Sequence, residues 1–316
     1  MLPSTKPYGP RIAADSIIKL KGATILQPMG QWPYWAQFWT TWDWATISRT
    51  IDNLETLGIN CLQVTATGLI ENGVPYPSDT VMRSNITQLA GYAASKGMVL
   101  NPQLGYQPAH TFAGGAAAAT IAAVRMAKLF CEQSNVAFID IMNEVNLSPA
   151  AGWSGPNAQA LSDIATMDAG VRAVVGNILC TWSIGCSNVG DYSGSWSQAV
   201  APYTDFHNVH AYTYQASGTA PLVSDLNAMR GAGWYKGRFV IGEIGVPVFR
   251  GEALQTSWMA GAKLLIDLPD CFGAIVWGAT DTSGTYDVTG FGLMDSTGTT
   301  LRPALTAPVS TWVGVI

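Results

Sequence analysis

Short runs of β-forming residues alternate with longer helical patterns along almost the whole 316-residue chain. No linker, low-complexity tract or block of charge interrupts this alternation. Several of the short runs, such as FVIGE (Phe239–Glu243), are apolar nearly throughout, which is typical of strands covered on both faces in a parallel sheet. The alternation therefore predicts an α/β protein in which helices follow parallel strands.

Eight strands and eight helices are expected. The strands are predicted at Ala23–Gln27, Cys61–Thr65, Val99–Gln103, Val136–Met142, Ile178–Trp182, Phe206–His210, Phe239–Glu243 and Ala274–Trp277. The helices are predicted at Ala45–Leu57, Thr80–Lys96, Ala116–Glu132, Ala158–Val175, Trp196–Ala201, Leu222–Ala232, Gly251–Asp267 and Leu305–Trp312.

Eight strand–helix units in about 300 residues match the (β/α)8 TIM barrel. The alternative is a doubly wound open sheet, which usually carries a glycine-rich turn after its first strand. The segment GATILQPMGQWPYW is not such a fingerprint. We therefore predict a single α/β barrel over residues 23–316, preceded by a short N-terminal arm of residues 1–22.

Charge and composition restrict the partners. Hydrophobic residues make up 48% of the chain and charged residues only 12%, with 16 basic against 21 acidic side chains. Because phosphate binding needs concentrated positive charge, the absence of a Lys/Arg cluster argues against nucleic acid. The most apolar stretch, 113–130, is interrupted by Arg125 and Lys128, so no membrane span is expected. A neutral partner is favoured.

Cofactor and metal chemistry have little support. The three histidines are scattered, and neither a phosphate-binding glycine loop nor a G-x-S-x-G elbow is present. The five cysteines lack C-x-x-C spacing, so we expect small buried hydrophobic residues rather than a zinc site or a disulfide framework. The N-terminus MLPSTKPYGP lacks the apolar core of a secretory signal.

Two of the six glutamates, Glu144 and Glu243, fall at the ends of the fourth and seventh predicted strands. In a barrel, chemistry takes place at the carboxyl ends of the strands. Two carboxyl groups on opposite walls of one mouth suit acid/base and nucleophilic attack on a glycosidic bond, which in retaining enzymes requires a separation of about 5–5.5 Å. The alternative is a pair of solvated carboxylates without a catalytic role.

Five motifs in the predicted barrel resemble the retaining glycoside hydrolases whose glutamates lie on strands four and seven. The likeness is to family five, of the cellulase and mannanase type. The motifs occur in the same order as in that clan: IMNEVN (Ile141–Asn146), VHAY (Val209–Tyr212), IGEIG (Ile241–Gly245), VWG (Val276–Gly278) and FGLMDSTGTTLRPAL (Phe291–Leu305).

The resemblance implies a role for each matching residue. Glu144 would be the acid/base, Glu243 the nucleophile, and Asn143 would bind the sugar 2-hydroxyl. His210 and Tyr212 would support the nucleophile and the sugar ring.

Trp277 would be the stacking platform, since an indole face suits the C–H side of a pyranose. For His210 and Trp277 a place in the barrel core is the alternative. His207 faces the other way by strand alternation, and we expect it to be structural.

Two departures from the clan stand out. Gln63 occupies the strand-two position where the clan commonly carries an arginine, and only Asn101 and Gln103 are present where it commonly carries a histidine. A missing arginine removes a charge that keeps the nucleophile ionised. The chain is then either a branch with neutral donors or a barrel whose activity has decayed.

Five tryptophans crowd the segment Gln31–Trp44 after the first predicted strand. Each could stack a sugar ring, so they suggest binding subsites beyond the central one, and a hydrophobic plug over the barrel is the alternative. The residues expected to face the cleft are Trp32, Trp35 and Trp39, with Trp153 as a further candidate; Trp42 and Trp44 are expected in the core.

Together these features predict a retaining β-glycoside hydrolase acting on a poly- or oligosaccharide, outside the cell or on a virion. The alternative is a glycan-binding or structural barrel without activity, as in a virion tail or cell-surface assembly. A barrel lyase or aldolase is a weaker option, because it needs a strand-end lysine that the chain lacks.

Overall fold

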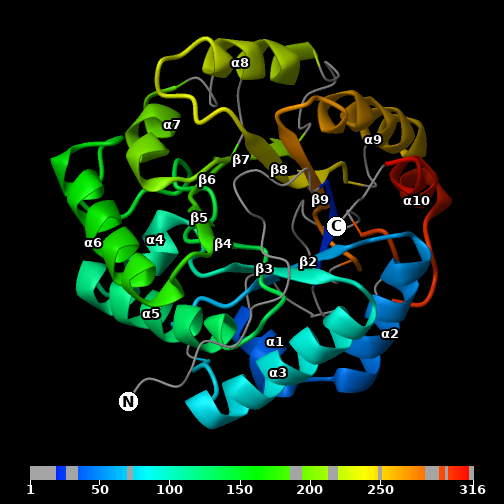
Figure 1. The fold of residues 1–316 in the computed structure, drawn as a ribbon, viewed down its shortest axis with the longest axis horizontal. Coiled ribbons are helices and arrows are strands. Elements are labelled where there is room, and N and C mark those ends of the chain that lie inside the picture. The colour runs from blue at the N-terminus through cyan, green and yellow to red at the C-terminus, as the bar shows by residue number, and fades with distance from the viewer. Residues whose placement is uncertain are drawn as a thin grey trace.

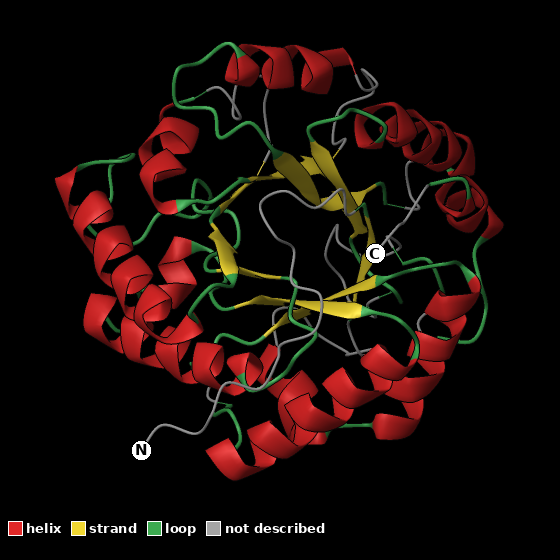
Figure 2. Cartoon of the chain, viewed as in Figure 1, coloured by secondary structure: helices red, strands yellow, loops and turns green. Residues whose placement is uncertain are grey.

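The computed structural model describes residues 19–25, 35–69, 74–185, 194–212, 220–247, 251–281, 292–295 and 298–312, with the backbone alone for Trp35 and residues 220–222. Within these residues the strands form one parallel sheet in the order β5-β4-β3-β2-β1-β9-β8-β7-β6. Helices surround the ring of strands (Figures 1 and 2). The predicted (β/α)8 barrel is confirmed.

The strands are between three and seven residues long. Their bounds are β1 (Leu20–Thr24), β2 (Cys61–Thr65), β3 (Val99–Gln103), β4 (Phe138–Asp140), β5 (Leu179–Thr181), β6 (Ser183–Gly185), β7 (His207–Tyr212), β8 (Phe239–Gly245) and β9 (Cys271–Val276). The first strand begins three residues before its predicted start. The predicted N-terminal arm lies almost wholly outside the described residues.

The fifth barrel strand is split in two. β5 pairs with β4, whereas β6 pairs with β7, and Trp182 lies between the two halves. The Trp182 side chain is fully buried and its Nε1 donates to the Asp168 carboxylate at 3.2 Å. The chain itself connects β5 to β6 and in this way closes the barrel. The nine strand segments therefore make up eight barrel strands.

The eight predicted helices are all present, and each of their ends lies within two residues of its expected position. Two further helices are present: α1 occupies part of the tryptophan-rich segment, and the short α4 follows β3. The bounds are α1 (Trp35–Thr41), α2 (Trp44–Thr56), α3 (Asp79–Ser95), α4 (Pro108–Thr111), α5 (Ala116–Cys131), α6 (Ala158–Val175), α7 (Ser195–Val200), α8 (Ala220–Arg230), α9 (Glu252–Ile266) and α10 (Pro303–Ser310), with a 3₁₀ turn at Ala201–Tyr203.

An apolar plug fills the amino-terminal end of the barrel. Its centre is three aromatic rings in edge-to-face contact, with Phe206 at 5.1 Å from Phe138 and 5.0 Å from Phe272. The other members of this plug come from the remaining strands and their flanks: Leu20, Cys61, Val99, Ala137, Val240 and Ile275.

A polar layer lies directly above the plug. Because side chains two positions apart on a strand share a face, the residues that follow the plug residues also point inward. They are Gln63 on β2, Asn101 on β3, Asp140 on β4 and Asn208 on β7, none more than 2% exposed. This polar layer supports the carboxyl end of the barrel.

A β-bulge on β8 sets the direction of Glu243. In the pairing with β7, Val209 lies opposite Ile241 and His210 lies opposite Glu243, so Gly242 is the extra residue. Strict alternation from the inward-facing Val240 would turn Glu243 outward, and the bulge restores its inward direction. Gly242 must lack a side chain here, since a Cβ would collide with the Asn208 amide.

Two further expectations from the sequence concern membrane-spanning helices and the cysteines. Within the described segments, no helix is long and apolar enough to cross a membrane. Cys61, Cys180 and Cys271 are buried free thiols, as expected for small apolar residues, while Cys131 is half-buried. Cys186 lies outside the described residues.

Candidate active site

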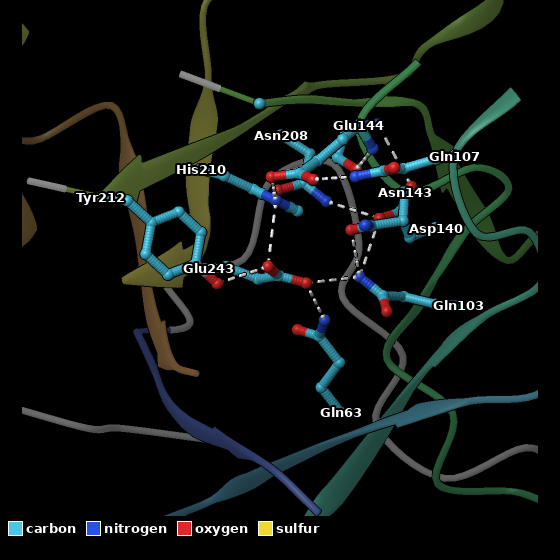
Figure 3. A network of polar contacts seen from close by, with 12 residues as sticks. Gln63, Gln103, Gln107, Asp140, Asn143, Glu144, Asn208, His210, Tyr212 and Glu243 are labelled. Carbon is cyan, nitrogen blue, oxygen red and sulfur yellow. Dashed lines mark hydrogen bonds and ion pairs between the residues drawn. The ribbon is translucent and has the colours of Figure 1, made fainter. Parts of the chain in front are cut away.

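Two glutamates meet at one imidazole ring at the carboxyl end of the barrel (Figure 3). His210 Nδ1 lies 3.3 Å from Glu144 Oε1 and 3.2 Å from Glu243 Oε2. Glu144 follows β4, His210 lies on β7 and Glu243 on β8. The ligand atoms of the three side chains all fall within 4.8 Å of one another. The structure therefore brings together the two glutamates that the sequence singled out.

Glu243 is held by a full set of donors. Its Oε1 accepts from Gln63 Nε2 at 3.1 Å and Gln103 Nε2 at 3.0 Å, and its Oε2 accepts from the Tyr212 hydroxyl at 2.6 Å. The side chain is 3% exposed. Gln63 thus contacts the nucleophile candidate from strand two, where the clan's arginine is expected, but as a neutral donor.

Glu144 is fixed by its backbone and by one amide. Its φ of 50° lies in the left-handed region, which is unusual for a residue with a side chain. Its N–H donates to Ser183 Oγ at 2.9 Å, and its Oε2 accepts from Gln107 Nε2 at 3.0 Å. Gln107 itself has a φ of 35°. Backbone strain at such positions is typical of functional sites.

Asn143 is tied to the same network. Its Oδ1 accepts from Gln103 Nε2 at 3.0 Å, the same nitrogen that donates to Glu243. The side-chain oxygen of Gln103, Oε1, in turn accepts from the Thr65 hydroxyl at 2.8 Å. One glutamine therefore links the expected 2-hydroxyl ligand to the expected nucleophile.

Charge balance in the site depends on His210. Burial alone lowers the pKa of His210, but the charge of Glu243 and hydrogen bonds to both glutamates raise it to about 10. Burial raises the pKa of Glu243, but the His210 charge and the bonds from His210, Tyr212 and Gln103 outweigh this and hold that pKa below its usual range. At neutral pH the centre thus contains an imidazolium beside an ionised nucleophile candidate.

The Glu144–His210–Glu243 cluster is also where a metal ion could find ligands, because three donor groups converge. However, the raised pKa of His210 means that a proton on Nδ1 already serves both carboxylates. A cation would have to displace that proton. The hydrogen-bond pattern is accounted for by an ion-pair network.

The other histidines lie elsewhere. His207 points to the outside of the barrel, where its ring stacks on Tyr235 at 5.3 Å and its Nε2 accepts from the Lys236 N–H at 3.1 Å. Burial, with the Lys236 charge, lowers the pKa of His207 to about 4. His207 thus faces away from the two glutamates, as strand alternation predicted. His110 is exposed on α4 and stacks at an angle on Tyr106.

The prediction that Trp39 faces the cleft is wrong. Trp39 lies on α1, is 0% exposed, and its Nε1 donates to the Thr65 carbonyl at 2.9 Å. Its ring stacks on Trp42 at 5.5 Å and meets Phe130 of α5 edge-on. The segment forms a helix where a loop was expected, and the apolar face of that helix packs into the layer around the barrel.

The remaining tryptophans have mixed outcomes. Trp42 and Trp44 are half-buried and pack on the apolar core, as expected. Trp153 is buried against Phe112 and Trp196, so its suggested role as a subsite is also wrong. Trp32 and the side chain of Trp35 lie outside the described residues. Trp277 follows β9 at the carboxyl end of the barrel, is 6% exposed and belongs to the apolar core, the alternative given for it.

Sequence reasoning missed four residues of the network: Gln107, Asp140 and Asn208 altogether, and Gln103 except as a departure from the clan. Strand alternation could have identified Asp140 and Asn208, since each lies two positions after a plug phenylalanine. Gln107 follows β3 in a loop, and no periodic signal marks it. The network of Figure 3 is thus wider than the sequence motifs.

Comparison with known proteins finds a likeness of fold. No family model matches the sequence, and no curated protein matches it. Among solved structures, the neighbours include family five glycoside hydrolases, in agreement with the resemblance seen in the motifs.

Three of these neighbours illustrate the likeness. The exo-β-1,4-mannosidase Op5Man5 from Opitutaceae bacterium strain TAV5 has a TM-score of 0.72 and 17% identity, over 92% of this chain and 58% of that chain. A GH5_18 structure from Streptomyces cattleya in complex with GlcNAc scores 0.68 at 14% identity, over 93% and 81%. The catalytic domain of CelCCA scores 0.67 at 14% identity, over 99% and 98%. At such identities the shared property is the fold.

Proposed function

We propose that this protein is a retaining β-glycoside hydrolase with Glu243 as nucleophile and Glu144 as acid/base. The observation that carries the proposal is the convergence of both carboxylates on His210, with their ligand oxygens within 4.8 Å. Retaining enzymes hold their carboxyl groups about 5–5.5 Å apart, whereas inverting enzymes leave about 6.5–9.5 Å for a water molecule. The close approach supports double displacement.

In the first step, Glu243 attacks the anomeric carbon while Glu144 transfers its proton to the leaving oxygen, which departs as an alcohol. In the second step, Glu144 takes a proton from water, and the hydroxyl oxygen displaces Glu243 from the sugar. His210 and Tyr212 keep Glu243 ionised and oriented through the contacts described above. Gln63 and Gln103 provide neutral donors in place of the clan's arginine and histidine.

The substrate class is a β-linked poly- or oligosaccharide. Two of the neighbours act on or bind mannosyl compounds: the exo-β-1,4-mannosidase and a GH5_18 variant from Bifidobacterium longum in complex with Manβ1-4GlcNAc. The present chain spans 58% of the mannosidase's length. β-Mannosides therefore come first in a substrate panel, followed by β-glucans.

The test is hydrolysis of aryl β-glycosides and β-linked polysaccharides by the wild type, Glu243→Ala and Glu144→Ala. We expect both variants to lose on the order of 10³-fold or more in kcat, as removal of a nucleophile or an acid/base does. Glu132→Ala is the matched control, because Glu132 is a surface glutamate paired with Arg83. Proton NMR of the first product anomer decides retention, and an inverted anomer would contradict the mechanism.

A glycan-binding barrel without activity is the second candidate. The observation in its favour is that Glu243 is only 3% exposed and fully engaged by protein donors. Under this alternative, the wild type and both variants would bind glycans equally, and none would hydrolyse any substrate in the panel.

A further inference from the structure

A buried carboxylate lies beneath the two glutamates and belongs to neither catalytic role. Asp140, at the end of β4, is 0% exposed and occupies the polar layer above the phenylalanine plug. No motif in the sequence drew attention to it. Burying a charged group is costly unless its partners compensate, so its contacts call for an account.

Three donors from three different strands converge on Asp140. Oδ1 accepts from the Ser183 N–H at 3.2 Å, and Oδ2 accepts from Asn208 Nδ2 at 3.2 Å. Gln103 Nε2 makes a longer contact with Oδ2, at 3.5 Å. Every one of these partners presents N–H, which matches an ionised carboxylate, because that group can only accept.

The Gln103 contact connects Asp140 to the glutamates. A primary amide has one end that donates and one that accepts, and rotating it by half a turn exchanges them. In Gln103, the nitrogen faces Glu243, Asn143 and Asp140, and the oxygen faces the Thr65 hydroxyl. With the amide reversed, its oxygen would point at the Glu243 carboxylate, which would repel it.

We propose that Asp140 is a positioning residue that fixes the Gln103 amide with its nitrogen toward Glu243 and Asn143. This inference rests on the proposed function, since it assigns the support of the nucleophile. Asp140 acts through Gln103 and contacts no substrate. The Gln103 amide needs such an anchor, because its two orientations have nearly the same shape and differ only in where the donor and the acceptor lie.

The charges that face Asp140 come from β7 and β8. Burial raises the pKa of Asp140, the His210 charge and the bonds from Ser183 and Gln103 lower it, and the Glu243 charge raises it, giving about 7. The anchor is therefore expected to weaken as the pH falls below about 7, where a protonated Asp140 would present a donor to the Gln103 nitrogen.

The first experiment compares the kinetics of the wild type with Asp140→Asn. The asparagine keeps the shape but can donate a hydrogen bond, so we expect it to allow the reversed Gln103 amide. The expected result is a fall in kcat of about 10-fold or more with KM within about threefold, because the disturbed bonds act on the reacting centre. We expect the wild-type kcat profile to show an inflection near pH 7, the pKa of Asp140, and the Asp140→Asn profile to lack it.

The matched control is Asp168→Asn. Asp168 is also a buried carboxylate. It lies on α6, outside the ring of strands, and contacts Trp182 and not Gln103. A merely structural role for Asp140 would lower the melting temperature in both variants and leave both pH profiles unchanged. Equal kcat and an unchanged profile in Asp140→Asn would overturn the proposal.

The second experiment does not depend on turnover, and it uses a variant only to assign signals. The side-chain amide signals of Gln103 in the unaltered protein, assigned by comparison with Gln103→Leu, are followed by NMR across pH 5–9. We expect them to shift with an inflection near pH 7, the pKa of Asp140. Amide signals that do not respond to pH would overturn the proposal even in an active enzyme. A clear inflection in a protein without hydrolytic activity would uphold the anchor and reject the proposed function.

Discussion

At the residue scale, His210 is the centre of the site because it is the cation that both glutamates share. Its folded-state pKa of about 10 lies above the ordinary value of 6.5. The native state therefore holds a proton that the unfolded chain releases. The stability gained from this proton is fully present below pH 6.5 and is lost as the pH rises toward 10.

We predict that the free energy of unfolding of the wild type falls between pH 6.5 and 10 with a contribution from this group on the order of 1 kcal/mol per pH unit. Chemical denaturation at several pH values measures it, and His210→Asn should lack this contribution. His207→Asn is the contrasting variant, because the pKa of His207 is lowered to about 4. The stability that neutral His207 contributes in the wild type is present above pH 6.5 and is lost as the pH falls toward 4. The same slope in His210→Asn and the wild type would argue against the imidazolium.

Residue chemistry was the most predictable part of the site. The glutamates, His210, Tyr212 and Gln63 were identified in the sequence, and the structure brings all of them together. Trp39 was not predictable in the same way. A tryptophan in a barrel-mouth segment suits sugar stacking and core packing equally. Because α1 is helical, the Trp39 side chain lies on its apolar face and packs into the core.

At the element scale, the half-strand β6 passes so close to Glu144 that a side chain at Gly185 would have to displace the Glu144 side chain. A Cβ added at Gly185 would lie 2.9 Å from the Glu144 carboxyl carbon and 2.8 Å from Leu147 Cδ1. We predict that Gly185→Ala displaces the carboxylate and lowers kcat by about 10-fold to 100-fold, since misplacement by about 1 Å can cost that much. Steady-state kinetics with circular dichroism measures the effect.

Gly91→Ala is the control for that substitution. Gly91 lies within α3, and a Cβ there meets nothing within 4 Å. Alanine in a helix should raise the free energy of unfolding by about 0.5–1 kcal/mol and leave kcat unchanged. If Gly185→Ala kept full activity, the close contact with Glu144 would have no bearing on catalysis.

The elements themselves were predicted well, and the irregularities within them were not. Apolar runs and helical periodicity report on burial, so they located strands and helices closely. The bulge at Gly242 and the break at Trp182 arise from pairing with neighbouring strands. Such contacts lie between residues far apart in the chain, and a local pattern carries no information about them.

At the scale of the whole molecule, the barrel separates stability from chemistry along its axis. The plug of three phenylalanines fills one end, and the charged network occupies the other. We predict that Phe206→Ala lowers the free energy of unfolding by about 3–5 kcal/mol, the usual cost of removing a buried phenylalanine. At temperatures well below its melting point, kcat should stay within about twofold of the wild type. Thermal denaturation beside kinetics measures both, and a large loss of kcat would show that the plug and site are coupled.

The sequence by itself determined the class of fold and the residues capable of the chemistry. Both follow from local properties, namely which stretches are apolar, with what period, and where acidic residues interrupt them. Only the tertiary structure decided how Gln103, Asp140 and Asn208 join the two glutamates in one network, and that Trp39 and Trp153 belong to the packing. The physical reason is that hydrogen bonds and pKa values in the site depend on distances of a few ångströms between eight strands, which barrel closure alone brings together.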